Sequence, residues 1–211
     1  LVGDFNNDGL QDLASGFSGA NTVTILLGNG NGGFSLAPGP AVSVVGGASS
    51  LVVGDFNRDG RQDLAATNQI SGTVTILLGT VGGGFSQPAG SPIGVGTYPQ
   101  SVAVADFNGD GKQDLAVGNT NSSNVTILLG DGSGGFSLAA SSPIGVGTEP
   151  YALAVGDFNG EGSQDFAVAS SSSLTILLNN CAGVGLQLPT LGNYPNSTII
   201  TGGNTIVTPS A

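Results

Sequence analysis

The chain has 211 residues, of which 39% are hydrophobic and only 8% charged, and its formal net charge is −11. It contains three basic residues, too few to line a phosphate backbone, which argues against a nucleic-acid-binding protein. It also has no run of 18 apolar residues, so we expect no membrane-spanning segment.

Negative charge is concentrated in one nine-residue motif that occurs four times. The motif reads DFNNDGLQD at 4–12, DFNRDGRQD at 55–63, DFNGDGKQD at 106–114 and DFNGEGSQD at 157–165. These copies hold twelve of the fourteen acidic residues and leave only Asp131 and Glu149 outside. The pattern predicts four sites for hard cations, and Ca²⁺ is the cation we expect.

The first copy illustrates the ligand chemistry. Side-chain oxygens stand at loop positions one, three, five and nine, and Gly9 at position six can turn the chain sharply because glycine tolerates positive φ. The carbonyl at position seven can then face inward. Ca²⁺ takes six to eight oxygens at about 2.3–2.6 Å, a number that these groups reach with water or one bidentate carboxylate. The predicted ligands are Asp4, Asn6, Asp8, the carbonyl of Leu10, and Asp12.

The opening residues match an EF-hand loop, but the flanks do not. Short apolar runs bounded by turn residues surround each copy, which indicates strands on both sides. An alternative is that Asp and Asn simply form Asx-turns. Four copies argue against that alternative, because turns do not need three acids within nine residues and the carboxylates would repel one another without a cation. In the fourth copy Glu161 adds a methylene, so we expect the weakest site there.

Between the loops, the order of segments is constant. In the third copy the predicted strands are PQSVAVADFN, KQDLAVGN, VTILLG and an irregular last strand within SLAASSPIGVGTEP. Four short antiparallel strands in about fifty residues describe a propeller blade, so the predicted fold class is all-β. The predicted units are an incomplete first blade at 1–45, blades at 46–97 and 98–148, the core of a fourth at 149–180, and a tail at 181–211.

The tail carries two β-prone stretches around Gly202-Gly203-Asn204, a hairpin signal. We expect this hairpin to supply either a closing strand of the last blade or a strand exchanged between subunits. Aromatic residues recur as well. One set is expected in the core between blades: Phe5, Phe56, Phe107 and Phe158. A second set follows the Gly-Gly turns and is expected at the blade edge: Phe34, Phe85 and Phe136.

The motif DFNxDGxxDLA with a downstream VTILLGxGxGGF resembles the FG-GAP repeat, also called the VCBS-type repeat, of integrin α-subunits and many secreted bacterial proteins. The resemblance covers roughly residues 1 to 180. It implies a β-propeller whose blade loops bind calcium on one rim. The resemblance also implies five ligands in each of the other three copies, of which Arg61, Lys112 and Ser163 would bind through their backbone carbonyls. These ligands are Asp55, Asn57, Asp59, Arg61 and Asp63; Asp106, Asn108, Asp110, Lys112 and Asp114; and Asp157, Asn159, Glu161, Ser163 and Asp165.

Such propellers usually close with about seven blades, whereas this sequence has four repeats. We therefore expect either a fragment of a longer protein or several chains that complete a shared sheet. An incomplete blade leaves unpaired strand edges, which favour self-association.

The function we expect is a secreted or cell-surface calcium-binding structural or adhesive module with protein or glycan partners. The alternatives are a lectin-like propeller and a filament subunit assembled by β-strand exchange. Catalysis is not expected, because the chain has no histidine, one cysteine (Cys181) and no nucleophile–base pair. Millimolar external calcium favours an extracellular location. N-glycosylation-type triplets begin at Asn121, Asn124 and Asn196.

Overall fold

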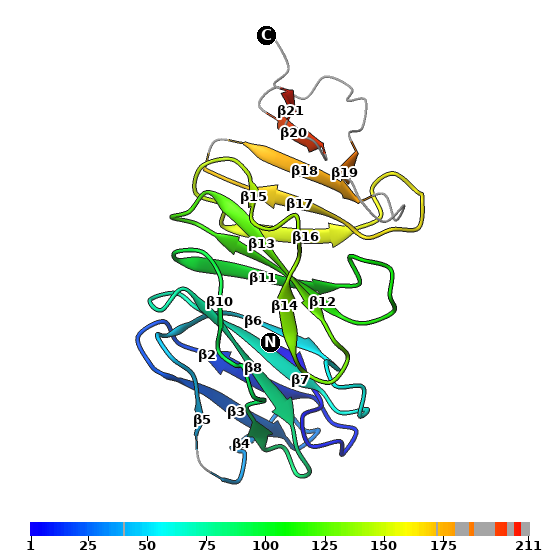
Figure 1. Ribbon diagram of the computed structural model, residues 1–211. Helices are drawn as coiled ribbons and strands as arrows, with labels where there is room; N and C mark the ends of the chain where they lie inside the picture. The colour runs from blue at the N-terminus through cyan, green and yellow to red at the C-terminus, as the bar shows by residue number, and fades with distance from the viewer. Residues whose placement is uncertain (40, 172, 180–185, 188–196, 202–204, 208–211) are drawn as a thin grey trace.

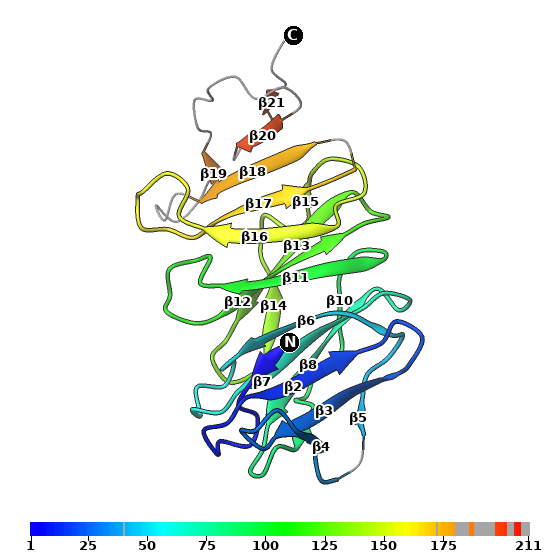
Figure 2. The same ribbon diagram turned by 180° about the vertical axis from the view of Figure 1, so that it is seen from behind.

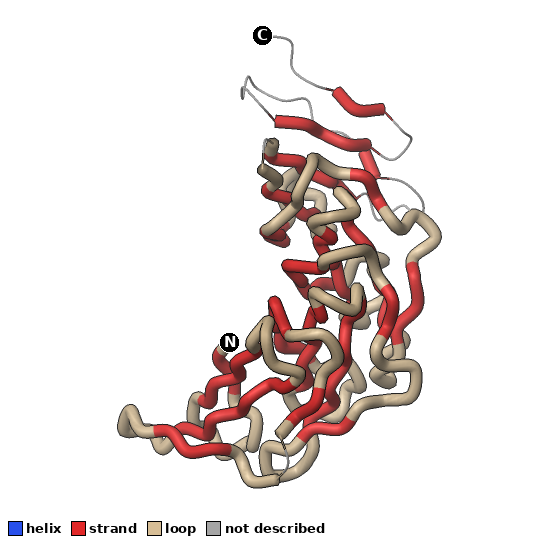
Figure 3. Tube along the Cα trace, turned by 90° about the vertical axis from the view of Figure 1, so that its left-hand side faces the viewer, coloured by secondary structure: helices blue, strands red, loops and turns tan. Residues whose placement is uncertain are grey.

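The computed structural model describes residues 1–39, 41–171, 173–179, 186–187, 197–201 and 205–207. Within this part of the chain all regular elements are strands, and no helix is long and apolar enough to cross a membrane. The strands form four sheets that follow one another along a curved path (Figures 1, 2 and 3). The all-β prediction is confirmed.

The second sheet shows the plan of one repeat. Three antiparallel neighbours make its main part: β6 (Ala48–Gly54), β7 (Asp63–Asn68) and β8 (Thr73–Gly79). The fourth strand is split. β9 (Phe85–Ser86) pairs with the end of β8, and β10 (Ile93–Gly94) pairs with its beginning. The irregular last strand expected from the sequence is thus two short strands along one edge.

The first and third sheets repeat this plan. The first contains β1 (Val2–Gly3), β2 (Asp12–Gly16), β3 (Thr22–Gly28), β4 (Phe34–Leu36) and β5 (Val42–Ser43). The third contains β11 (Pro99–Ala105), β12 (Asp114–Asn119), β13 (Asn124–Gly130), β14 (Phe136–Leu138) and β15 (Ile144–Gly145).

The fourth sheet is extended by the tail. Its first three strands are β16 (Ala152–Gly156), β17 (Asp165–Ala169) and β18 (Leu174–Asn179). Next to β18 lie β19 (Leu186–Gln187), which is antiparallel to it, and β20 (Ser197–Thr201), which is parallel; β21 (Thr205–Val207) pairs with β20. The turn predicted at 202–204, Cys181 and Asn196 lie outside the described residues.

The core lies between the sheets. In β13 four consecutive side chains, Val125, Thr126, Ile127 and Leu128, are each 5% exposed or less. Both faces of this strand are buried because a neighbouring sheet packs on each side of it. This explains why the third strand of each repeat reads as a nearly continuous apolar run rather than a strict alternation.

Aromatic contacts hold the junctions between sheets together. Phe5, Phe56 and Phe107 are 4%, 2% and 8% exposed, as predicted for core residues. Phe158 differs, since 49% of its surface is exposed. The reason is that no further sheet of the described chain packs on that side of the fourth sheet. Phe34 is likewise 49% exposed, and among the described residues no sheet packs against that side of the first sheet.

Candidate metal-binding loops

Each acidic loop connects the first strand of its sheet to the second. The loops therefore lie on the same side of the array, at the right in Figure 1 and at the left in Figure 2. The spacing of the copies along the sequence thus becomes a regular spacing along one rim of the molecule.

Within the first loop the side-chain oxygens turn inward. The backbone N–H of Asp8 donates to Oδ1 of Asp4 at 3.1 Å and to Oδ1 of Asn6 at 3.0 Å. The N–H of Gly9 donates to Oδ2 of Asp4 at 2.9 Å, and the N–H of Leu10 donates to Oδ1 of Asp8 at 2.8 Å. Oxygens of positions one and three therefore meet at a single N–H group.

The other three loops repeat this arrangement. In each, the N–H of position five donates to Oδ1 of both position one and position three, and the N–H of position six donates to Oδ2 of position one. The oxygens that converge belong to Asp55 and Asn57, to Asp106 and Asn108, and to Asp157 and Asn159.

Two backbone positions of the loop are left-handed. Position six is glycine throughout, with φ between +78° and +90°, as the turn requires. Position four is also left-handed, with φ of 61° at Asn7 and 60° at Arg58. The second turn was not expected, although asparagine and glycine at this place in three of the four copies are residues that tolerate this conformation.

The aspartate at position nine has a different environment from the other acids. Asp12 is completely buried; its Oδ2 accepts from the N–H of Phe5 at 2.8 Å and its Oδ1 accepts from the N–H of Gly28 at 2.8 Å. The equivalent residues make the same two bonds, to position two of the loop and to the end of the third strand: Asp63, Asp114 and Asp165. This residue ties the loop to the sheet.

Burial and hydrogen bonding shift the pKa values of the acidic side chains in opposite directions. Burial raises the pKa of Asp63 and of Asp114, against the lowering effect of their N–H partners. The charges of Asp59 and of Asp110, at position five, raise them further. At position five itself, the N–H of Arg61 lowers the pKa of Asp59. The acids of one loop therefore lie close enough to repel one another.

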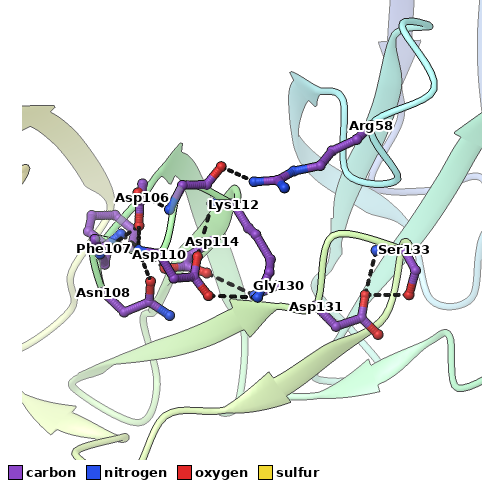
Figure 4. A network of polar contacts seen from close by, with 12 residues as sticks. Arg58, Asp106, Phe107, Asn108, Asp110, Lys112, Asp114, Gly130, Asp131 and Ser133 are labelled. Atoms are coloured by element: carbon purple, nitrogen blue, oxygen red, sulfur yellow. Dashed lines mark hydrogen bonds and ion pairs between the residues drawn. The ribbon is translucent and has the colours of Figure 1, made fainter.

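Basic side chains offset part of this repulsion in two loops. Arg61 donates to Oδ2 of Asp59 at 2.7 Å. In the third loop, drawn in Figure 4, Lys112 donates to Oδ2 of Asp110 at 2.9 Å, and this bond lowers the pKa of Asp110. Both basic residues stand at position seven, where the sequence predicts a carbonyl ligand. Leucine and serine occupy position seven in the first and fourth loops.

The donor atoms of the loops are carboxylate and amide oxygens, which are the ligands that a hard cation prefers. A carboxylate offers about four acceptor sites, so an oxygen that accepts one N–H keeps a free lone pair. Positions one, three and five offer the exposed oxygens that would hold the cation, and the ligands expected at positions seven and nine stay predictions. Among the described residues, however, no three Asp, Glu, His or Cys side chains lie close enough together to hold a metal ion by themselves. A cation bound in these loops would therefore also depend on the amide oxygen of position three.

One polar residue of the loop was missed by the sequence reasoning. Oε1 of Gln62, at position eight, accepts from the N–H of Asp4 in the preceding loop at 2.8 Å. Oε1 of Gln113 accepts from the N–H of Asp55 at 2.7 Å. Glutamine stands at position eight of all four copies, and this was the available signal. The residue joins consecutive loops to each other.

Two solved structures share the fold. One is a lectin of Agrocybe aegerita that recognises non-reducing terminal N-acetylglucosamine, with 20% identity and a TM-score of 0.56 over 89% of this chain and 50% of that one. The other is BBS1N in complex with ARL6DN, with 15% identity and a TM-score of 0.54 over 99% of this chain and 55% of that one. The chain thus spans about half the length of each. Among curated proteins there is no significant match.

These likenesses agree with the predicted propeller, of which the four sheets form an unclosed part. The repeats themselves are recognised by a family model. The model of the FG-GAP-like repeat matches residues 4–66, 55–117 and 106–168, which overlap in register and begin at the first residue of an acidic loop each time. The chain belongs to the FG-GAP-like repeat family.

Proposed function

We propose that this chain is a calcium-binding structural or adhesive repeat module of the extracellular space or cell surface, without catalytic activity of its own. The observation that carries the proposal is the shared N–H at position five. In every loop it draws a carboxylate oxygen of position one and an amide oxygen of position three to one point. Two hard donors are therefore side by side before any cation arrives.

The acids of the loop would then serve to fix two strands of a blade. Asp55, Asn57 and Asp59 would hold the cation, while buried Asp63 anchors the loop to the end of β8. Binding to the folded state alone stabilises it by roughly 2.7 kcal/mol per site at a hundred times the dissociation constant. Extracellular calcium, at millimolar concentration, is sufficient for weak sites of this kind.

Thermal unfolding with calcium and with EDTA tests the proposal. We expect chelation to lower the melting temperature and added Ca²⁺ to restore it. Asp59→Asn, in a loop, should reduce the difference between the two conditions. Asp131→Asn is the matched control, because Asp131 lies outside the loops and Asn29 occupies its place in the first repeat. A melting temperature that EDTA leaves unchanged would refute the proposal.

Binding of a carbohydrate is a second candidate, favoured by two equivalent cavities at the junctions of adjacent sheets. One, of about 470 Å³, is lined by Ile25 and Phe85, among others. The other, of about 200 Å³, is lined by Ile76, Phe136 and Asp131. Both cavities combine apolar and polar groups, and the larger one has the size of a small-molecule site.

The likeness to a lectin that recognises N-acetylglucosamine supports this second candidate only at the level of the fold. A glycan array with the calcium-loaded protein tests it. Binding that survives Asp59→Asn but is lost with Asp131→Ala, at the edge of the smaller cavity, would support the candidate. If no glycan binds at millimolar concentration, the candidate is wrong.

A further inference from the structure

The basic residues of the chain are confined to two of its four acidic loops. The three Lys and Arg residues of the sequence are Arg58 and Arg61 in the second loop and Lys112 in the third. The first and fourth loops contain three acids each and no basic residue. All positively charged side chains therefore stand within segments that we expect to bind a cation.

Position seven places its side chain on the carboxylate of position five. In the second loop the backbone N–H of Arg61 donates to Oδ1 of Asp59 at 2.9 Å, and its Nη1 donates to Oδ2 at 2.7 Å. In the third loop the N–H and the Nζ of Lys112 donate to Oδ1 and Oδ2 of Asp110, both at 2.9 Å. A single basic residue thus contacts both oxygens of the carboxylate in each loop.

The first loop has the same backbone arrangement without the charge. The N–H of Leu10 donates to Oδ1 of Asp8 at 2.8 Å. The side chain of position seven also follows a similar course, since a Cβ atom added to Gly30 would lie 3.2 Å from Cδ2 of Leu10. A Cβ atom added to Gly132, the equivalent glycine, would lie 3.0 Å from Cδ of Lys112. At position seven the two loops therefore differ in charge more than in shape.

We propose that Arg61 and Lys112 are tethered counter-ions, which hold the position-five carboxylates of their loops in the absence of calcium and which calcium displaces when it binds. This inference rests on the proposed function, because it concerns the same loops. It gives the second and third sites a lower affinity for calcium than an uncharged residue at position seven would allow. It also makes these two loops less dependent on calcium for their shape.

The hydrogen bonds at Asp59 show why calcium must displace the counter-ion. Its Oδ2 accepts from Nη1 of Arg61 at 2.7 Å and from Nδ2 of Asn57 at 3.1 Å. A carboxylate oxygen has two lone pairs, so both acceptor sites of this oxygen are used. A cation that takes Oδ2 of Asp59 as a ligand therefore has to replace one of these two donors.

Both ion pairs are accessible enough to be replaced. The side chains of Arg61 and Asp59 are 39% and 31% exposed. Those of Lys112 and Asp110 are 32% and 34% exposed. Exposed ion pairs contribute little to stability, because water competes for both partners. The counter-ion can therefore give way to a divalent ion, although a positive charge that stays nearby still repels it.

Arg58 makes a different contact and provides the matched control. It stands at position four of the second loop, and its Nη2 donates to the carbonyl of Gly111 in the third loop (Figure 4). It has the same charge as Arg61 but is bonded to a neutral backbone oxygen. Asn7 occupies position four of the first loop with the same left-handed backbone, so Arg58→Asn removes the charge without straining the turn.

A calcium titration followed by NMR tests the proposal, with the glycine at position six as the reporter of each site. The N–H groups of Gly9, Gly60 and Gly111 each donate to Oδ2 of position one in their own loop. The amide signal of each glycine should therefore respond to a cation in that loop. In the wild type we expect Gly9 to respond at a lower calcium concentration than Gly60 and Gly111.

Substitutions at position seven should change the affinity of one site at a time. Arg61→Leu at the second site and Lys112→Leu at the third should each tighten binding on the order of fivefold, which is the upper range for an exposed ion pair. Leu10→Lys should weaken the first site by a similar factor. Arg58→Asn should leave the second site within about twofold of the wild type, since no carboxylate is released.

Amide hydrogen exchange in EDTA measures the counter-ion without calcium. The N–H of position seven donates to the carboxylate that the counter-ion holds. After correction for the intrinsic rate of each residue, this N–H should exchange faster in Lys112→Leu than in the wild type, and more slowly in Leu10→Lys. Unchanged exchange in both variants would show that the side chain does not hold the loop.

The outcomes separate this inference from the proposed function. If the reporter glycines respond to calcium but Arg61→Leu and Lys112→Leu leave the affinities unchanged, the counter-ion role is wrong and the proposed function stands. If Arg58→Asn tightens the second site as much as Arg61→Leu, net charge governs affinity, and displacement from Asp59 does not. If no reporter glycine responds to calcium, both the inference and the proposed function are wrong.

Discussion

Gln62 in the second repeat accepts a hydrogen bond from the backbone N–H of Asp4 in the first, at 2.8 Å and across 58 residues of sequence. Asp4 opens one acidic loop, and Gln62 directly precedes Asp63, the last residue of the next. Two consecutive loops are therefore joined by a single bond. The start of each such loop is positioned by the repeat that follows it, so neighbouring loops depend on each other for their shape.

We predict that Gln62→Ala destabilises the fold by about 1–3 kcal/mol, because the half-buried N–H of Asp4 loses its acceptor. Urea unfolding at a concentration where the chain is monomeric measures the change. Gln11→Ala is the matched control at the same loop position, where the side chain is exposed, and should stay within about 0.5 kcal/mol of the wild type. Equal effects of the two substitutions would contradict the role given to Gln62.

A second prediction compares the buried aspartate at position nine of the loop with the exposed aspartate at position five. Asp63→Asn should cost about 2–3 kcal/mol both in EDTA and in calcium, because the buried carboxylate accepts two N–H bonds that do not involve a cation. Asp59→Asn should change stability chiefly when calcium is present. Denaturant titrations in both buffers make the comparison. An effect of Asp63→Asn that disappears in EDTA would show that its main partner is the cation.

Much of the architecture follows from local sequence pattern. Regular copies of an acidic loop, flanked by apolar strands, predict repeated antiparallel sheets, and Gly9 takes the positive φ that its place in the motif requires. The packing of β13 follows as well, since a run such as VTILLG needs an apolar environment on both faces.

What the sequence does not reveal depends on contacts between repeats. The recurrence of glutamine at position eight singles out Gln62, but the sequence does not show that its amide meets an N–H of the preceding loop. The same applies to Asp12, which is buried where the N–H of Gly28, at the end of β3, donates to its Oδ1. Phe158 looks identical to Phe107 in the sequence, and only the missing neighbour exposes it. Local residues predict the repeat, whereas the surroundings of each repeat decide the role of its side chains.

The dependence of stability on pH offers a third prediction, at Asp131. The N–H of Ser133 lowers the pKa of this carboxyl below its ordinary value of 3.8. A lowered pKa in the folded state contributes stability above the ordinary pKa, and this contribution is lost as the pH falls through the folded-state pKa. In the first repeat Asn29 accepts equivalent N–H bonds, from Asn31 and Gly33, both at 2.9 Å.

Asp131→Asn should therefore preserve the turn but remove the titrating group. We expect the wild type to be more stable than this variant near pH 7, by less than about 1 kcal/mol because the side chain is exposed. The difference should shrink as the pH is lowered below 3.8. Unfolding curves of both proteins between pH 7 and pH 2.5 give the comparison. A difference that grows on acidification would mean that the hydrogen bonds favour the protonated carboxyl.

The fourth loop provides the last prediction, because Glu161 is the one glutamate among the four copies at position five. Its N–H donates to Oδ1 of Asp157 and of Asn159 as in the other loops, so the backbone is already arranged in the same way. Only the length of the side chain differs. The extra methylene carries the carboxylate past the point that an aspartate reaches, and we expect weaker calcium binding at this site.

Glu161→Asp should then tighten binding at the fourth site by on the order of tenfold, or ~1.4 kcal/mol. The converse substitution, Asp110→Glu, is the matched control and should weaken the third site by a similar factor. Calorimetric titration of each variant resolves the change against the three unaltered sites. If the wild-type fourth site proves the tightest of the four, the reach of the position-five carboxylate does not govern affinity, and the position-one and position-three oxygens must dominate instead.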